Sequence, residues 1–484
     1  MTPLRVAMLT QNDWRHDSRV VREAQAVSSA GYEVTTVCRG VSASSEEVDG
    51  VRYVSIPRPL RVPVRRLPHL LAIHLRVLVA DASGLVRGPD RPQRLLSGLE
   101  ALALVGLAVP AGLAALAVLG AERLRKLRPG WQPTERMRRV AKVVRRTAAY
   151  VAQPWAYLNE YADATAEELA ALQPLVVHAH DLVTLSAGAA LTRSTGATLI
   201  YDAHELETET NYWTLNALTR RELRRYERAL TPATAGVVTV CDSIADWLAR
   251  EYRLPRPVVV LNAPTEEAGE SSREVRETLG LPESTPLAVY VGSVTIDRGL
   301  ENCVRALAHA PSLHLATVGP RNAEMEATLL EIAAGSGVAD RLHLVDPVPP
   351  ARVTSFIRTA TCSVIAIQNV CLSYAFCLPN KLLESVFAGL PVAVSDLPEM
   401  RRFVEATGCG VVMDERDPAA IARALLAVAS DRDRYRLRGE ELERVTREFG
   451  WPAQRSKLLE LYAQLDHDPA GHGARPAGAT IVMR

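Results

Sequence analysis

The stretch Cys377–Asp396, "CLPNKLLESVFAGLPVAVSD", reads as a short helix followed at once by a strand. Pro379 suits the first turn of a helix, where its missing N–H costs nothing. Gly389 and Pro391 are typical of the end of that helix. The run "VAVS" that follows is apolar enough for a strand covered on both faces. This stretch therefore predicts one unit of a parallel sheet covered by helices.

The same alternation continues in both directions along the chain. After residue 286 it predicts strands in "LAVYVG", "LHLATVG", "LHLVDPV", "CSVIAIQ", "VAVSD" and "GVVMD", with helices over 299–308, 322–334, 351–359, 380–387 and 418–429. Before residue 265 it predicts strands in "RVAMLT", "EVTTVC", "VRYVSI", "LVVHAHD", "TLIYDAHE", "GVVTVC" and "VVVLNAP". Two such series predict an α/β chain of two doubly wound, Rossmann-like domains that face a cleft.

Breaks in this alternation predict the domain boundaries. The first domain is expected over 1–262 and the second over 273–445, with the polar linker "NAPTEEAGESS" between them. A C-terminal helix is expected over 446–466. The tail 467–484 is rich in Gly, Pro and Ala, which predicts disorder.

Charge is unevenly distributed along the chain. The net charge of +1 gives no indication of a nucleic-acid partner, but residues 60–150 hold 17 Arg and Lys against 5 Asp and Glu. Within them Ala101–Gly120, "ALALVGLAVPAGLAALAVLG", carries no charge and is broken by Pro110. A single crossing would separate strands of one sheet, so we expect a helical insertion that attaches residues 91–128 to the inner leaflet. A helical hairpin packed on protein is the alternative.

Cysteine usage points to a reducing compartment. Seven cysteines occur, an odd number, and none form a CxxC pair. We therefore expect neither a disulfide framework nor a zinc site. The expected location is cytoplasmic, attached peripherally to the cytoplasmic face of the membrane.

Two patches carry residues suited to a nucleotide. In "PNKLLE", Lys381 lies at a helix start, where free amide groups favour an anion, and Glu384 follows on the same face. A cation for phosphate beside a carboxylate for ribose hydroxyls describes a nucleotide site. In "YVGSVTIDRGLENC", Arg298 stands just before a helix that follows a strand. A surface ion pair and a solvated arginine are the alternatives.

These motifs resemble those of retaining GT-B glycosyltransferases, specifically glycosyltransferase family 4 (group 1). "VGSVTIDRGLENCVRAL" and "LPNKLLESVFAGLPVAVSDLPEM" are similar to two segments of its nucleotide-sugar-binding half. "HDSRVVREAQAVSSAGYEVTTVC", "VVHAHD", "YDAHELE" and "VTVCDSIADWL" are typical of its acceptor-binding half. The resemblance covers roughly 5–58 and 175–445 and leaves out 60–150.

The resemblance assigns roles to individual residues. It implies a donor site of Gly292, Ser293, Arg298, Asn380, Lys381 and Glu384. It implies catalytic roles for His180, Asp181, Arg298 and Lys381, and substrate contacts for Arg19, His204, Glu205 and Phe376. Arg298 and Lys381 would hold the donor diphosphate without a metal, and the nucleotide sugar would be a co-substrate, with no cofactor.

The sequence also departs from the family pattern. Phe376 stands where many relatives have a glutamate, and the first loop, "QNDWRHDSR", lacks their glycine pair. The implied function is transfer of a sugar from a nucleotide sugar to an acceptor hydroxyl with retention. A membrane-linked acceptor in polysaccharide or glycolipid synthesis would explain the insertion. The alternatives are a small soluble acceptor, a nucleotide-sugar epimerase, and a membrane scaffold without catalysis.

Overall fold

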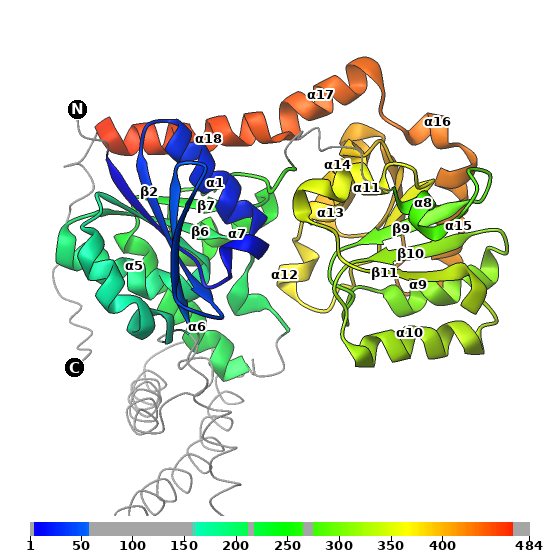
Figure 1. Cartoon of the computed structure of the whole chain (residues 1–484), viewed down its shortest axis with the longest axis horizontal. Helices are drawn as coiled ribbons and strands as arrows, with labels where there is room; N and C mark the ends of the chain where they lie inside the picture. The colour runs from blue at the N-terminus through cyan, green and yellow to red at the C-terminus, as the bar shows by residue number, and fades with distance from the viewer. Residues whose placement is uncertain (1–3, 58–157, 159, 212–216, 265–273, 468–484) are drawn as a thin grey trace, which may run out of the picture.

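The computed structural model describes residues 4–57, 158, 160–211, 217–264 and 274–467. They form two β-sheets that are parallel apart from one edge strand, and helices cover both faces of each (Figure 1). The expected α/β architecture of two Rossmann-like units is confirmed. Each sheet, together with the helices that cover it, forms one layer of the molecule, the first around β1–β8 and the second around β9–β14. The insertion 60–150, with the run Ala101–Gly120, lies outside the described residues, as do most of the linker and residues 468–484.

The first sheet has the order β3-β4-β2-β1-β5-β6-β7-β8. Its strands are β1 (Arg5–Leu9), β2 (Glu33–Gly40), β3 (Ser44–Val48), β4 (Val51–Pro57), β5 (Val176–His180), β6 (Thr198–Ala203), β7 (Gly236–Thr239) and β8 (Val258–Val259). The edge strand β3 pairs antiparallel with β4 and was not expected. As an edge strand with one neighbour, β3 is largely exposed, and its sequence, "SSEEV", is polar. It therefore lacks the apolar pattern from which a strand is predicted.

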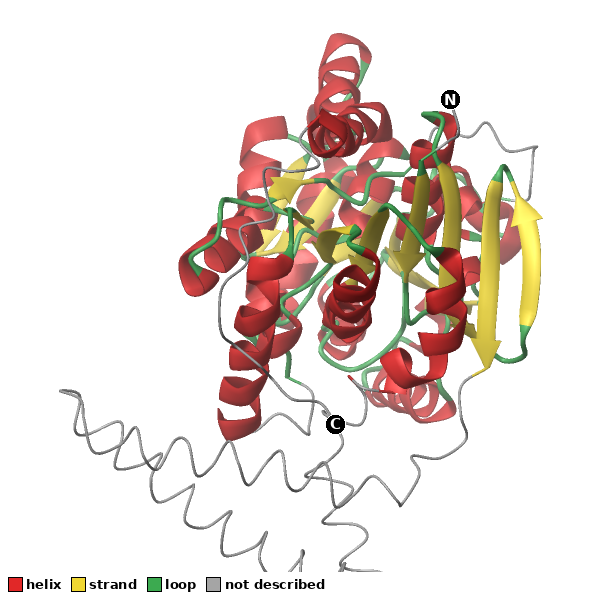
Figure 2. Cartoon of the chain, turned by 90° about the vertical axis from the view of Figure 1, so that its left-hand side faces the viewer, coloured by secondary structure: helices red, strands yellow, loops and turns green. Residues whose placement is uncertain are grey.

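Helices pack on both faces of the first sheet (Figure 2). They are α1 (Ser18–Ser29), α5 (Asp181–Thr195), α6 (Ala217–Leu230) and α7 (Asp242–Tyr252), with a further helical segment over 160–172 and the 3-10 turns η1 (Trp14–His16), η3 (Glu207–Glu209) and η4 (Thr231–Ala233). Helix α1 begins at a side-chain cap, since Asp17 accepts a hydrogen bond from the Val20 amide at 3.2 Å. Asp17 also accepts a hydrogen bond from the Thr10 hydroxyl at 3.3 Å, which places the start of α1 beside the carboxyl end of β1.

The second sheet has the order β11-β10-β9-β12-β13-β14 and is wholly parallel. Its strands are β9 (Leu287–Val291), β10 (His314–Val318), β11 (Leu342–Val345), β12 (Cys362–Ile365), β13 (Val392–Ser395) and β14 (Gly410–Met413). Its helices are α8 (Val275–Leu279), α9 (Leu300–Ala306), α10 (Ala323–Gly335), α11 (Val353–Ile357), α12 (Leu372–Ala375), α13 (Asn380–Phe387), α14 (Pro398–Thr407), α15 (Pro418–Ser430) and α16 (Arg432–Tyr435). The 3-10 turns are η5 (Leu307–His309), η6 (Ala339–Arg341) and η7 (Pro350–Arg352).

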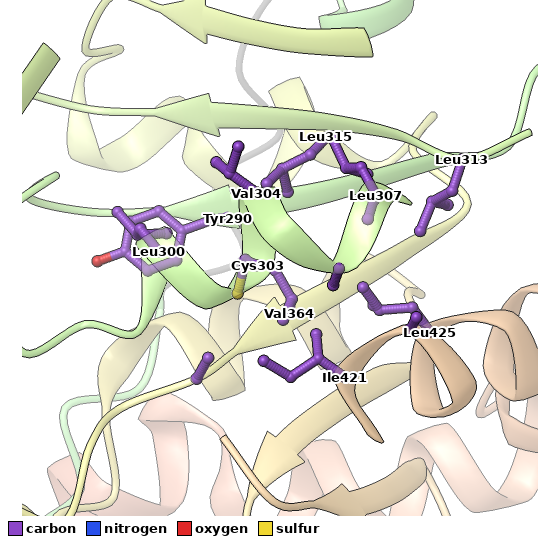
Figure 3. Packing of buried hydrophobic residues seen from close by; sticks show 14 of the residues in the cluster. Tyr290, Leu300, Cys303, Val304, Leu307, Leu313, Leu315, Val364, Ile421 and Leu425 are labelled. Atoms are coloured by element: carbon purple, nitrogen blue, oxygen red, sulfur yellow. The ribbon is translucent and has the colours of Figure 1, made fainter. Parts of the chain in front are cut away.

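The core of this second layer shows why the apolar runs form buried strands. Leu300 and Val304 of α9 pack with Tyr290 of β9 and with Ile421 and Leu425 of α15 (Figure 3). All five are less than 2% exposed. Burial of each such side chain stabilises the folded state by about 1.5–3 kcal/mol. This packing holds the strands in place, and with them the polar loops that follow the strand ends.

The last two helices of the described residues are α17 (Gly439–Phe449) and α18 (Trp451–His467). One helix over 446–466 was expected, but Gly450 is extended, with ψ of 162°, and Pro452 follows in the first turn of α18. Helix α18 returns from the second layer and lies across the first (Figure 1). Within the described residues, no helix is both long enough and apolar enough to span a bilayer.

Candidate active site

Lys381 lies in the first turn of α13 against the end of β9. Its Nζ donates to the Tyr290 hydroxyl at 2.7 Å and lies 4.0 Å from the centre of that ring. Burial lowers the pKa of Lys381 to about 7, and the neighbouring Arg298 adds to the shift. An anion bound here would restore the charge of the lysine, because the site itself disfavours that charge.

Gly292 provides close access to this lysine. It follows β9 with a φ of +114°, and a Cβ at this position would lie 3.2 Å from Lys381 Nζ. The loop then returns tightly to the sheet, since a Cβ on Gly299 would lie 2.2 Å from the Ala366 carbonyl oxygen. Both positions therefore require glycine, and at Gly292 the backbone lies close to the ammonium group of Lys381.

Arg298 supplies a second cation at the same strand ends. Its guanidinium lies 4.8 Å from the centre of the Tyr374 ring, and its buried Nε has no hydrogen-bond partner in the described part of the chain. Glu384 follows Lys381 by one turn of α13. Burial raises the pKa of Glu384, while Lys381 and Arg22 oppose that rise. Two cations and a carboxylate thus gather where α13 begins.

Asp202 organises the opposite side, at the carboxyl ends of β5 and β6. Its Oδ2 lies 3.2 Å from His180 Nδ1 and 3.1 Å from His204 Nε2. Arg19 donates to both of its oxygens at 2.9 Å. Burial alone would raise the pKa of Asp202, but Arg19 and the two histidines hold it well below the usual range. Asp202 is therefore a fixed anion.

The histidines differ in their exposure. His180 is fully buried, whereas the side chains of His204 and Asp181 are 18% and 19% exposed and lie 3.3 Å apart. Burial would lower the pKa of His204, but Asp181 and Asp202 raise it to about 10. Asp181 has a φ of +64°, a strained conformation that is often found at functional sites. His204 is therefore the accessible imidazolium, and His180 lies beneath it.

Four residues of this side could be considered as metal ligands. Glu23, His178, His180 and Asp202 each offer an atom within 4.8 Å of the others. Arg19 already lies 3.0 Å from Glu23 and 2.9 Å from Asp202. Because Arg19 already pairs with both carboxyl groups, a divalent ion would have to displace it, and the cluster is better suited to holding Arg19.

Contacts between the two layers bring both groups together. Ser373 donates to Glu205 at 3.3 Å, and Asn211 donates to Asp297 at 2.7 Å. The thiol of Cys241 donates to the Phe376 carbonyl at 2.9 Å, and the Phe376 ring packs on the core of the first layer. Arg22 of α1 interacts with Glu384 of α13. Residues of α1, β5 and β6 therefore share an interface with α12 and α13.

The structure brings most of the expected site residues into two groups. Gly292, Arg298, Lys381 and Glu384 form one, and Arg19, His180, Asp181 and His204 form the other. Ser293 and Asn380 are exposed beside the first group. Asp202 and Tyr290 were not selected from the sequence, although "YDAHE" and "AVYVG" contain them. A polar residue inside each strand run was the available signal.

Comparison with known proteins agrees with this geometry. Residues 271–444 match the family model of Glycosyl transferases group 1, and residues 118–264 match that of Glycosyltransferase Family 4. Both halves of the chain thus match glycosyltransferase family models, the second half that of group 1. The chain is also 30% identical over 193 residues to the D-inositol 3-phosphate glycosyltransferase of Xylanimonas cellulosilytica, and the match covers 39% of this chain and 45% of that protein. The chain thus spans less than half the length of this curated relative.

Solved structures of similar fold can be superposed on nearly the whole of this chain. Sucrose-phosphate synthase from Thermosynechococcus elongatus has a TM-score of 0.64 at 16% identity, covering 96% of this chain and 99% of that chain. Anabaena Alr3699/HepE, in complex with UDP and glucose, has a TM-score of 0.56 at 11% identity, covering 96% and 100%. The expected GT-B fold is confirmed.

Proposed function

We propose that this protein transfers a sugar from a nucleoside-diphosphate sugar to an acceptor hydroxyl, with retention of configuration. The pairing of Lys381 with Arg298 beside Gly292 carries the proposal, because two cations lie where backbone can approach a diphosphate. Retention rests on the resemblance to retaining enzymes. Alr3699/HepE, which has the same fold, was solved with UDP and glucose, in support of a nucleotide-sugar donor.

In this proposal each group of residues has a separate task. As the glycosidic bond breaks, negative charge develops on the leaving diphosphate and positive charge on the sugar. Lys381 and Arg298 would stabilise the diphosphate, and Glu384 would accept hydrogen bonds from the ribose hydroxyls. His204 and Asp181, the accessible pair of the first layer, would orient the acceptor and the transferred sugar.

The acceptor has two candidate sources. The basic composition of residues 60–150 and the uncharged run Ala101–Gly120 favour a membrane-linked acceptor, reached from the cytoplasmic face. The relatives named D-inositol 3-phosphate glycosyltransferase favour a small phosphorylated polyol. Flotation with phosphatidylglycerol vesicles separates them: binding that is lost on deleting 91–128 supports the first source, and transfer to inositol phosphate without vesicles supports the second.

The proposed reaction is tested by nucleotide release from UDP-, GDP-, ADP- and dTDP-sugars. We expect one donor class to react, and Lys381→Ala and Glu384→Ala to lose most of the rate. Glu405→Ala, an exposed carboxylate change on α14, is the matched control. Proton NMR of the product then reports the anomeric configuration. Release by Lys381→Ala at the parent rate would contradict the assignment of the donor site.

A further inference from the structure

Tyr462 connects the returning helix α18 to the histidines of the first layer. The side chain is 1% exposed, and its hydroxyl lies 2.9 Å from His178 Nδ1. Its ring meets Tyr32 edge-on at 5.5 Å within a core cluster that also includes residues of β1, β2 and β4. Figure 1 shows α18 running from the end of α17 across the first layer. A residue far along the chain therefore reaches the carboxyl end of β5.

His178 lies directly against His180. The two rings are stacked, with centres 4.4 Å apart and an angle of 15° between planes. They occupy alternate positions of β5 and so share one face of the sheet. His180 in turn contacts Asp202 at 3.2 Å and His204 at 3.1 Å. A change in the ring of His178 thus acts on His180 without touching a substrate.

The surroundings of His178 determine which nitrogen carries its proton. Burial holds the pKa of His178 well below the usual value, so the ring is neutral. Its Nε2 faces Glu23 at 3.8 Å and Asp202 at 4.0 Å. Burial raises the pKa of Glu23 to about 8, whereas Asp202 is the fixed anion, so Asp202 is the carboxylate that favours a hydrogen at that nitrogen. Nδ1 is then an acceptor, and the Tyr462 hydroxyl is the donor to it.

We propose that Tyr462 is a positioning residue, whose hydroxyl fixes the tautomer and orientation of His178 and thereby the place of His180 beside Asp202 and His204. The proposal rests on the proposed function for its consequence in catalysis. It makes the seating of α18 on the first layer a condition for a correctly arranged site. The helix that joins the two layers is then part of the catalytic arrangement as well as of the fold.

The test compares Tyr462→Phe with Tyr53→Phe. Tyr53 belongs to the same core cluster, is equally buried, and its hydroxyl has no hydrogen-bond partner among the described residues. Histidine ¹⁵N spectra of the full chain should show His178 protonated at Nε2. In Tyr462→Phe the signals of His178 and His180 should shift, and in Tyr53→Phe they should not. The kcat should fall about tenfold in Tyr462→Phe, the loss that one buried hydrogen bond represents, with the donor KM unchanged.

Three results bear on the proposal in different ways. A wild-type His178 protonated at Nδ1 would overturn it without any variant, even if Tyr462→Phe fails to fold. Histidine signals and kcat that are alike in the two variants would also overturn it. If the wild type transfers no sugar from any donor, the proposed function fails, while the spectra still decide the role of Tyr462.

Discussion

Lys381 occupies an environment that disfavours its own charge. The Tyr290 ring and hydroxyl surround its ammonium group, and Arg298 repels it. With a pKa of about 7, the unliganded lysine loses its proton as the pH rises above neutrality. A bound diphosphate favours the charged form and raises that pKa again, so binding above pH 7 requires uptake of a proton.

We predict that affinity for a nucleoside diphosphate falls as pH rises above about 7, by up to tenfold per pH unit. Lys381→Arg should remove this dependence, because a guanidinium stays charged. Calorimetric titrations of both proteins measure it, and ionisation of the ligand cancels in the comparison. Parallel curves for the two proteins would mean that Lys381 is not the titrating group.

Gly292→Ala tests the close approach of backbone to this lysine. The new Cβ would lie 3.2 Å from Lys381 Nζ at a φ of +114°, so we expect a loss of about 1–3 kcal/mol of stability and at least tenfold weaker nucleotide binding. Gly335→Ala in α10 is the control, because a Cβ there meets nothing within 4 Å and the φ is ordinary. Equal nucleotide affinity in the two variants would exclude the predicted approach.

His204 should make stability depend on pH. Its folded-state pKa of about 10 lies above its ordinary 6.5, so its stabilising contribution is complete below pH 6.5 and is lost between these values. In His204→Gln the fall in the free energy of unfolding over this pH range should be smaller by at least about 1.4 kcal/mol, the free energy of one pKa unit. Urea unfolding across that range measures it, with the exposed His309→Gln as control. If the free energy of unfolding falls with pH as steeply in His204→Gln as in the wild type, His204 is not the group responsible.

At the scale of elements, α12 and the loop before α13 hold the two layers together. The Phe376 ring packs on the core of the first layer, and its carbonyl accepts from Cys241. The family resemblance implied a glutamate at this position, and the packing of the ring explains how an apolar side chain fits there. The loop that precedes Lys381 is therefore placed by contacts with the first layer.

We predict that Phe376→Ala lowers the free energy of unfolding by about 1–2 kcal/mol, less than for a fully buried ring. Nucleotide affinity should fall as well, because the loop leading to α13 loses its support. Ile296→Ala, at a side chain that is 65% exposed, should change stability by less than about 0.5 kcal/mol. A Phe376→Ala protein as stable as Ile296→Ala would show that the ring contributes little.

Most elements could be predicted because their apolar periodicity reflects burial on both faces. Helix α13 was predicted with its observed bounds, since Pro379 and Gly389 mark its ends. Strand β3 and the break at Gly450 were not predicted from the sequence, because a polar edge strand and a change of helix direction leave weak local signals. Lys381 and Glu384 could be paired by helical spacing alone. Asp202 could not, because its partner Arg19 lies 183 positions away in the sequence.

At the scale of the whole molecule, the chain passes between the layers twice, near Asn262 and at α17–α18. Arg22 of α1 lies at both passages, since it donates to the Asn262 side chain and lies 5.8 Å from the centre of the Trp451 ring. It also interacts with Glu384 of the donor group. We expect the two layers to close around a bound donor, as is usual for this architecture. Such closure would change the contacts of Arg22 at both connections.

Thermal unfolding in the presence of UDP, GDP, ADP or dTDP tests the central claim, that α13 and β9 form a nucleoside-diphosphate site. One nucleotide at 100 times its dissociation constant should stabilise the wild type by about 2.7 kcal/mol. Lys381→Ala should lose this stabilisation, and Lys457→Ala on α18 should keep it. If no nucleotide raises the melting temperature of the wild type, or if Lys381→Ala responds like the wild type, the donor site has been misplaced.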